Sequence, residues 1–196
     1  VGLPFFTPAY RPNCKIHVRA GHLAPHGNIE DVLRESMAAP FFPVPLDVFQ
    51  AEFEFTDFSP GAIFDLGDGI RVRTAPLHHP NGATCYRVDY DGKSICYVTD
   101  TEHIPGDPDQ NILGLIRGAD LVIYDCTYID EEFHHYVGWG HSTWQEGIRL
   151  CQAAGARRLA IYHHDPARDD DELDVIGAEA AKQLAGSIVA REHETI

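Results

Sequence analysis

Residues 140–173 read GHSTWQEGIRLCQAAGARRLAIYHHDPARDDDEL, and this stretch contains a complete helix-strand unit. The run STWQ at residues 142–145 is a capping-box pattern, which predicts a helix that extends to Ala154 and ends at Gly155. Residues 158–162 form an apolar run typical of a strand that is buried on both faces. The stretch therefore predicts an α/β protein with a parallel sheet.

The same alternation of helix and strand continues on both sides of this unit. Upstream, the pattern predicts a helix over 110–117 and an apolar strand over 119–124. Downstream, acidic residues in the first turn favour a helix over 170–184, since they suit the positive end of the helix dipole. Residues 187–192 are expected to form a closing strand.

The first half of the chain is richer in strands and turns. A helix is expected over 29–37 with Asn28 as its N-cap, and Asp91-Gly92 is the pair that a type I′ hairpin turn requires. Hairpins followed by α/β units predict two packed layers of sheet with outer helices. The strands are expected at residues 15–18, 48–55, 61–65, 70–75, 84–90 and 94–99.

Composition limits the classes of protein and partner. The 196 residues are 44% hydrophobic, which predicts one domain over residues 1–196. We expect no membrane contact and a cytoplasmic location, because no signal peptide or apolar run of roughly 20 residues is present. The five cysteines lack a CxxC pair and should be reduced and mostly buried. A formal net charge of −15 disfavours DNA, large RNA and anionic membranes as partners.

Side chains that can bind metal follow several of the predicted strands. If these strands are parallel, their carboxyl ends meet at one edge of the sheet, where imidazole and carboxylate groups together favour a divalent cation. Each residue alone is more typical of a turn or a helix cap, but turn chemistry explains the whole set less well. The residues are His78, His79, Asp100, Asp125, His163 and His164.

Several segments resemble the later motifs of metallo-β-lactamase-fold hydrolases. They are similar to the branch that holds phosphoribosyl cyclic-phosphate phosphodiesterases and tRNA 3′-processing endonucleases. The resemblance covers nearly the whole chain and implies a four-layer αββα sandwich. It is carried by LHHPNGATCYRV, YVTDTE, DLVIYDCTY, the stretch at 140–173 and IVARE, with support from GLPFFTPAYRPNCKIHVRAGH and VLRESMAAPFFPVPL.

The resemblance also implies roles for particular residues. The residues that match metal ligands are His79, Asp100 and His163, and Asp100 matches the ligand that bridges two divalent ions. These ions would be zinc or, alternatively, manganese. His141 resembles a histidine that acts near the scissile phosphate, although a loop histidine that only fixes the helix cap is the alternative. His78 and His164 would be structural. Asp125 would orient a ligand histidine or only cap its strand.

One motif of the family is absent from this sequence. The His-x-His-x-Asp-His loop, which supplies most of the metal ligands, would precede the segment GLPFFTPAY. We therefore expect an N-terminally incomplete domain with an incomplete metal site. Three explanations are open: the chain is a fragment, another polypeptide or a second copy completes it, or the site has been lost.

The function that the resemblance implies is hydrolysis of a phosphodiester by a metal-bridging hydroxide, with Asp100 and His141 as catalytic residues. The acidity of the chain favours a small phosphodiester over tRNA. A lactone or thioester hydrolase on the same fold is an alternative, as is a non-catalytic interaction module. A metal sensor built on His17, His22 and His26 is a weaker one. The loop at 129–140 should cover the site, and its aromatic residues either stack on a base or sugar or only pack the loop.

Overall fold

The computed structural model describes residues 2–23 and 27–195. They form two compact units, one that ends at Ser59 and one that begins at Pro60. A single domain over residues 1–196 therefore stays a prediction. Within the described ranges no helix is long and apolar enough to cross a bilayer. All five cysteines are free and four of them are buried.

The first unit contains a two-stranded parallel sheet and one α-helix. The strands pair with Lys15 opposite Glu52 and Ala20 opposite Asp57. The helix α1 follows Asn28, whose side chain accepts a hydrogen bond from the amide of Asp31, as predicted. In chain order the elements are η1 (Leu3–Phe5), η2 (Thr7–Tyr10), β1 (Lys15–Ala20), α1 (Ile29–Ser36), η3 (Leu46–Val48) and β2 (Glu52–Asp57).

The strand predicted at residues 48–55 differs from the one observed. Leu46–Val48 form a 3₁₀ turn, and the amide of Gln50 donates to the carbonyl of Ala9, so the strand begins only at Glu52. It pairs in parallel with β1 and is not part of a run of hairpins. Period-two alternation reports which face of a strand is buried but not the direction of its partner, which explains the error.

The second unit is built on a seven-stranded mixed sheet in which neighbours in sequence are neighbours in space. The strands from β3 to β6 are antiparallel, and those from β6 to β9 are parallel. In chain order the elements are β3 (Ile63–Asp65), β4 (Arg71–Leu77), β5 (Ala83–Tyr90), β6 (Lys93–Val98), α2 (Gln110–Ile116), β7 (Leu121–Asp125), α3 (Asp130–Phe133), α4 (Trp144–Ala154), β8 (Leu159–Tyr162), α5 (Asp170–Gln183) and β9 (Ile188–Val189).

Local signals in the sequence set most of these boundaries. Asp91 and Gly92 have φ angles of 47° and 71°, so both have the positive φ of a type I′ turn between β5 and β6. Thr143 caps α4 by accepting from the amide of Glu146, and Gly155 ends this helix with a φ of 65°. The closing strand is shorter than predicted, because only Ile188–Val189 pair with β8.

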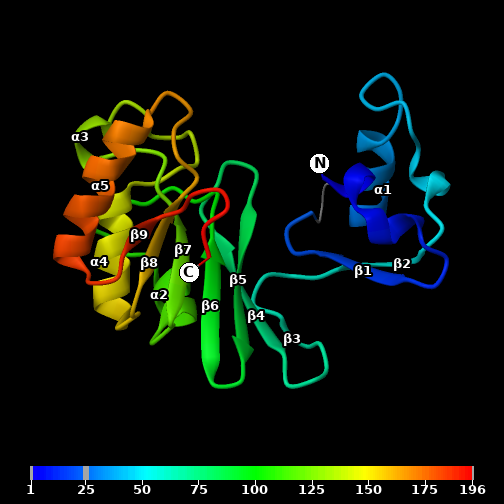
Figure 1. The fold of residues 1–196 in the computed structure, drawn as a ribbon, viewed down its shortest axis with the longest axis horizontal. Coiled ribbons are helices and arrows are strands. Elements are labelled where there is room, and N and C mark those ends of the chain that lie inside the picture. The colour runs from blue at the N-terminus through cyan, green and yellow to red at the C-terminus, as the bar shows by residue number, and fades with distance from the viewer. Residues whose placement is uncertain (1, 24–26, 196) are drawn as a thin grey trace. The chain divides into compact units, whose positions relative to one another are not determined.

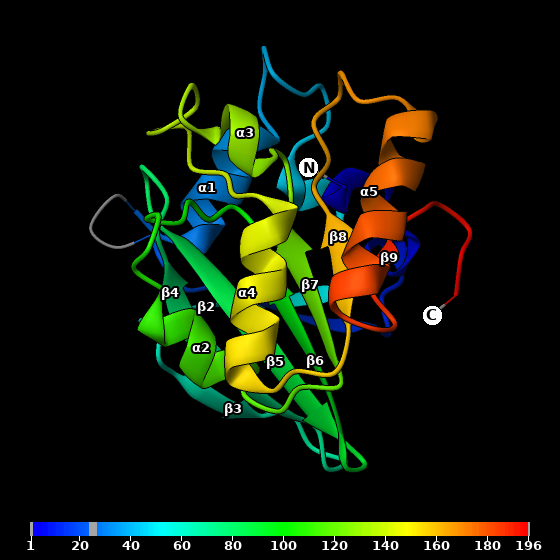
Figure 2. The same ribbon diagram turned by 90° about the vertical axis from the view of Figure 1, so that its left-hand side faces the viewer.

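One face of the large sheet is covered by α2, α4 and α5, as Figure 1 and Figure 2 show. The apolar side chains of the parallel strands and of α4 form the core between these layers. Each of the following is at most 1% exposed: Val98, Val122, Ile148, Leu159 and Ile161. Because β6, β7 and β8 run in parallel, the residues that follow them lie at the same edge of the sheet.

Gly147 provides a test of the packing of α4 on the sheet. A Cβ atom at this position would lie 2.9 Å from Tyr124 Cδ1 and 3.2 Å from Leu159 Cδ2, both within the core. We expect Gly147→Ala to lower the free energy of unfolding by about 1–3 kcal/mol, the usual cost of overpacking. Urea denaturation of the purified chain measures this change.

Gly114 in α2 is the matched control. A Cβ atom there would meet nothing within 4 Å, so Gly114→Ala should stabilise the chain by up to about 1 kcal/mol through helix propensity alone. A Gly147→Ala variant as stable as the control would contradict the close approach of α4 to β7 and β8.

Candidate functional site

The carboxyl ends of β4, β6, β7 and β8 bring the candidate residues to one edge of the sheet. The strand β4 has the same direction as β6, because both are antiparallel to β5. Asp100 and His163 follow β6 and β8 with φ angles of 59° and 60°. This left-handed conformation is uncommon for residues other than glycine, and such strain is often concentrated at functional sites.

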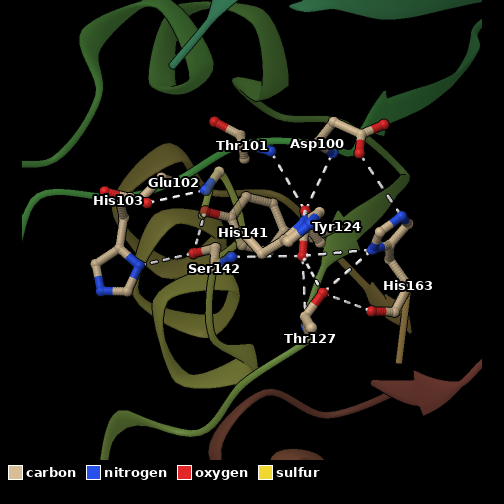
Figure 3. A network of polar contacts seen from close by, with 11 residues as sticks. Asp100, Thr101, Glu102, His103, Tyr124, Thr127, His141, Ser142 and His163 are labelled. Atoms are coloured by element: carbon tan, nitrogen blue, oxygen red, sulfur yellow. Dashed lines mark hydrogen bonds and ion pairs between the residues drawn. The ribbon is translucent and has the colours of Figure 1, made fainter. Parts of the chain in front are cut away.

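The side chain of Asp125 accepts most of the hydrogen bonds of the polar network at this edge. Figure 3 labels several of its partners, among them Asp100, Thr127 and His141. Asp125 is completely buried and ends β7. Its Oδ2 accepts the amides of Asp100 and Thr101 at 3.1 and 3.3 Å and lies 3.0 Å from His141 Nδ1. Its Oδ1 lies 2.9 Å from the hydroxyl of Thr127. These contacts offset the cost of burying a carboxylate.

Asp100, His141 and His163 form a cluster that can hold a metal ion. Each contributes one donor atom, and the donor atoms lie within 4.8 Å of one another. His163 Nε2 is 3.7 Å from Asp100 Oδ1, and the rings of His141 and His163 stack with centroids 4.9 Å apart. Two imidazoles and a carboxylate suit zinc, whose catalytic sites have three protein ligands.

His79, which the resemblance assigns as a ligand, lies next to this cluster but not within it. The centroids of its ring and that of His141 are 6.3 Å apart. Its Nδ1 is buried and has no hydrogen-bond partner among the described residues. A Cβ atom on Gly140 would lie 2.4 Å from the His79 ring, so only glycine allows the two segments to approach this closely.

Asp125 also determines the protonation of His141. The hydrogen bond from His141 to the Asp125 carboxylate raises the pKa of the imidazole, although partial burial opposes this shift. Because Nδ1 is used by Asp125, Nε2 is the nitrogen available to a metal ion or a substrate. The same pairing serves a metal ligand or a proton donor equally well.

A second group of contacts behind the cluster was not anticipated from the sequence. Glu102 is buried, and its Oε2 accepts the amides of Gly138 and Gly140 at 2.7 and 3.0 Å, which fixes the loop that carries His141. Ser142 Oγ contacts the ring of His103 at 2.8 Å and the hydroxyl of Tyr124 at 3.0 Å. In the sequence, the role of Glu102 is indicated only by its place at the end of the segment VTDTE, and an acidic residue there also suits a turn.

The remaining predicted residues have structural contacts. His78 Nδ1 lies 3.3 Å from the carbonyl of Glu102, and His164 Nε2 lies 3.3 Å from the carbonyl of Ala190. For the metal-sensor alternative, His17 pairs with Glu54 at 2.7 Å, and His26 lies outside the described residues. Within the described ranges, the cluster of Asp100, His141 and His163 is the group that meets the geometry of a metal site.

A mixed α/β sheet with histidine and carboxylate donors at the ends of its strands defines a class of metal-dependent hydrolases. A family model described as "Beta-lactamase superfamily domain" matches residues 14–164. The chain therefore belongs to this superfamily, the metallo-β-lactamase-fold hydrolases, as its motifs predict.

Two curated relatives are both named ribonuclease Z. Ribonuclease Z of Nocardia farcinica is 28% identical over 127 residues, which are 65% of this chain and 36% of the relative. Ribonuclease Z of Brevibacillus brevis is 32% identical over 83 residues, which are 42% of this chain and 24% of the relative. The matches thus cover about a third or less of these relatives' own length.

Solved structures confirm the predicted α/β fold class. The metallo-beta-lactamase fold protein YhfI of Bacillus subtilis gives a TM-score of 0.65 at 18% identity, covering 90% of this chain and 63% of that one. The short form of human tRNase Z gives a TM-score of 0.63 at 18% identity, covering 93% of this chain and 66% of that one. A diphosphatase from the PhnP family gives a TM-score of 0.62 at 19% identity, covering 97% of this chain and 63% of that one.

The pairing of His141 with Asp125 can be tested by titration of the metal-free protein. In chelator-treated chain the pKa of His141 should exceed its ordinary value of about 6.5, and Asp125→Asn should lower it. Folding raises this pKa, so the pair of His141 and Asp125 stabilises the folded chain. This contribution is fully present below the pKa of His141 in the unfolded chain and is lost as pH rises through its pKa in the folded chain. Proton NMR of the His141 ring, assigned with His141→Gln, measures the shift.

The control for this titration is Asp120→Asn, which removes the same charge from a carboxylate that contacts Ser94 rather than the cluster. An unchanged pKa of His141 in Asp125→Asn, with the fold intact by circular dichroism, would contradict the assigned contact.

The metal content of the chain tests the cluster directly. After dialysis against zinc or manganese and then buffer, we expect well under two ions per chain, because among the described residues only Asp100, His141 and His163 converge closely. Asp100→Ala should cause the largest loss, since it removes the only carboxylate of the cluster. Elemental analysis measures this, with His193→Ala, an exposed histidine near the C-terminus, as the control. Two tightly retained ions would show that other ligands contribute.

Proposed function

We propose that this protein is a metal-dependent hydrolase that cleaves a small phosphodiester of the cyclic phosphate or cyclic nucleotide type. The observation that supports this proposal is the convergence of Asp100, His141 and His163 at one sheet edge, with the buried Asp125 behind them. A neighbour with the same fold is described as a diphosphatase from the PhnP family, which supports a substrate that contains phosphate.

In this proposal two members of the cluster, Asp100 and His163, hold the metal, zinc or manganese, together with the neighbouring His79. The third member of the cluster, His141, is then left to act on the substrate. The residues that hold the metal fit this role, because His79 Nδ1 is buried without a partner in the described chain and the Asp100 side chain is 49% exposed beside His163. A divalent cation would supply Lewis-acid activation of water and of the phosphoryl group. Contacts of Thr127 with the ring and the carbonyl of His163, at 3.1 and 2.7 Å, fix the orientation of this histidine.

His141 is proposed to act on the leaving group. Its raised pKa favours the protonated imidazole, which can donate a proton from Nε2 to a departing alkoxide or stabilise a phosphoryl oxygen. The Asp125 carboxylate holds the ring through Nδ1 and stabilises its positive charge. Asp125 is thus a positioning residue, while Asp100 and His141 contact the reacting groups.

RNA processing is a second candidate, because the curated relatives are named ribonuclease Z. The formal net charge of −15 favours a substrate with few phosphates over a long polyanion. Turnover of a 2′,3′-cyclic nucleotide and of a structured tRNA precursor, measured side by side, separates the two. The same assay with a lactone and a thioester tests the other chemistries of this fold, and absence of all turnover favours a non-catalytic module.

A cytoplasmic location stays a prediction. Completion of the site by a second copy or another chain also stays a prediction, and for this reason activity assays should use the chain alone and the chain together with any segment encoded upstream of it.

Substitution of His141 separates proton donation from metal binding. We expect His141→Ala to lower kcat by roughly 10²–10⁴-fold, the usual contribution of a general acid, and to leave metal content and KM nearly unchanged. The loss should be smaller for bis(p-nitrophenyl) phosphate than for a cyclic nucleotide, since p-nitrophenolate departs without a proton and a ribose alkoxide does not. Steady-state kinetics and elemental analysis measure both effects.

The comparison variants are Asp100→Ala and His163→Ala, which should lose metal and activity together. Loss of metal in His141→Ala would make His141 a ligand. Unchanged rates with both substrates would leave it as a histidine that only fixes the loop.

A further inference from the structure

A pocket of about 450 Å³ opens beside the metal-binding cluster, with His141 and His163 in its wall. Its volume lies within the range of roughly 300–1,000 Å³ that is typical of small-molecule sites. The opposite walls come from the loop after α3 and from the turn that follows His163. A substrate whose phosphate lies at the cluster would therefore place the rest of its structure in this pocket.

One wall of the pocket is aromatic. Tyr128 and Tyr136 are stacked on each other, with centroids 4.1 Å apart and planes 4° apart. The rings of Trp139 and Tyr136 meet edge to face, with centroids 5.6 Å apart and an angle of 85° between their planes. Trp139 remains 63% exposed. Among the described residues no ring stacks on a face of Trp139, so this large apolar side chain is available to a planar group.

The other wall provides hydrogen-bond acceptors rather than positive charge. Asp165 Oδ1 accepts the amide of Ala167 at 2.8 Å, which fixes this half-buried carboxylate at the pocket. The part of the chain that the structure describes contributes no lysine or arginine to the pocket lining. Nearby, Arg168 is paired with Glu132. A second phosphate is therefore disfavoured here, whereas hydroxyl or amino donors are suited to Asp165.

We propose that this pocket binds a nucleoside: the base stacks on Trp139, and the ribose hydroxyls donate to Asp165. The proposal rests on the proposed function, since it assigns the remainder of a phosphodiester substrate whose phosphate lies at Asp100, His141 and His163. Stacking on an aromatic ring tolerates any base, and a fixed carboxylate is a common acceptor for ribose hydroxyls. The expected ligand class is a nucleotide with one phosphate.

Binding of adenosine to the metal-free chain tests the proposal without any catalytic step. Adenosine should quench the fluorescence of Trp139, while ribose 5-phosphate should not. Trp139→Phe retains only the buried Trp144 and should lose the quenching. By calorimetry, Trp139→Ala should weaken adenosine binding roughly 5- to 150-fold, the value of one base stacked on an aromatic ring, and Trp139→Phe should weaken it much less.

Two further measurements separate stacking from loss of fold. Val137→Ala, at an exposed position of the same loop, is the matched control and should bind adenosine as the unaltered chain does. Asp165→Asn should weaken binding of adenosine but not of 2′,3′-dideoxyadenosine. Equal affinity for ribose 5-phosphate and adenosine monophosphate, or full adenosine affinity in Trp139→Ala, would overturn the proposal.

The source of the nucleoside is either a free nucleotide or the end of an RNA chain. If it is the end of an RNA chain, oligoadenylate should bind more tightly than adenosine monophosphate, whereas equal affinity indicates a free nucleotide. Binding of both no tighter than that of ribose 5-phosphate would overturn the nucleoside pocket. Hydrolysis of bis(p-nitrophenyl) phosphate tests the proposed function separately. Turnover of that ester without adenosine binding would refute the pocket assignment alone. Adenosine binding without turnover, both by the chain alone and by the chain together with any segment encoded upstream of it, would refute the hydrolase alone.

Discussion

The burial of a single carboxylate, that of Asp125, constrains the geometry of the whole candidate site. A carboxylate without contact to water is costly unless donors surround it, and here they come from three segments that are distant in sequence. The amide of Asp100 comes from the turn after β6, His141 from the loop before α4, and Thr127 from the chain just beyond β7. Moving any of these segments would leave the charge with fewer partners.

Because backbone amides provide several of the hydrogen bonds to Asp125, the side chains of the cluster remain available to a ligand. Asp100 donates its amide to Asp125 and keeps its own carboxylate 49% exposed. His141 uses only Nδ1 for Asp125. The donors of the cluster are therefore held in place by the fold itself, an arrangement that lowers the cost of ordering them when a ligand arrives.

Local signals predicted the elements that carry the site, since turns and caps depend on a few adjacent residues. Asp91-Gly92 and the STWQ run are examples. The strand ends could also be predicted, because parallel strands bring their carboxyl ends together. The parallel pairing of β2 and the roles of Glu102 and Ser142 could not, since they depend on contacts between segments far apart in sequence. For the same reason the motif comparison alone did not reveal that His79 lies outside the cluster.

The acidity of the chain and the proposed phosphate substrate are compatible only if the attraction is local. At physiological ionic strength the field of the surface carboxylates is screened over about 8 Å, so the excess of acidic residues has little influence within a small pocket. There, a bound divalent cation would determine the sign of the potential, and His141 would add positive charge when it is protonated. The divalent cation and His141 can balance the negative charge of one phosphate. Each further phosphate of a long RNA needs a cationic partner of its own. The pocket lining in the described chain contains no lysine or arginine, and Arg168 is already paired with Glu132. The proposal of a substrate with a single phosphate is consistent with this distribution of charge.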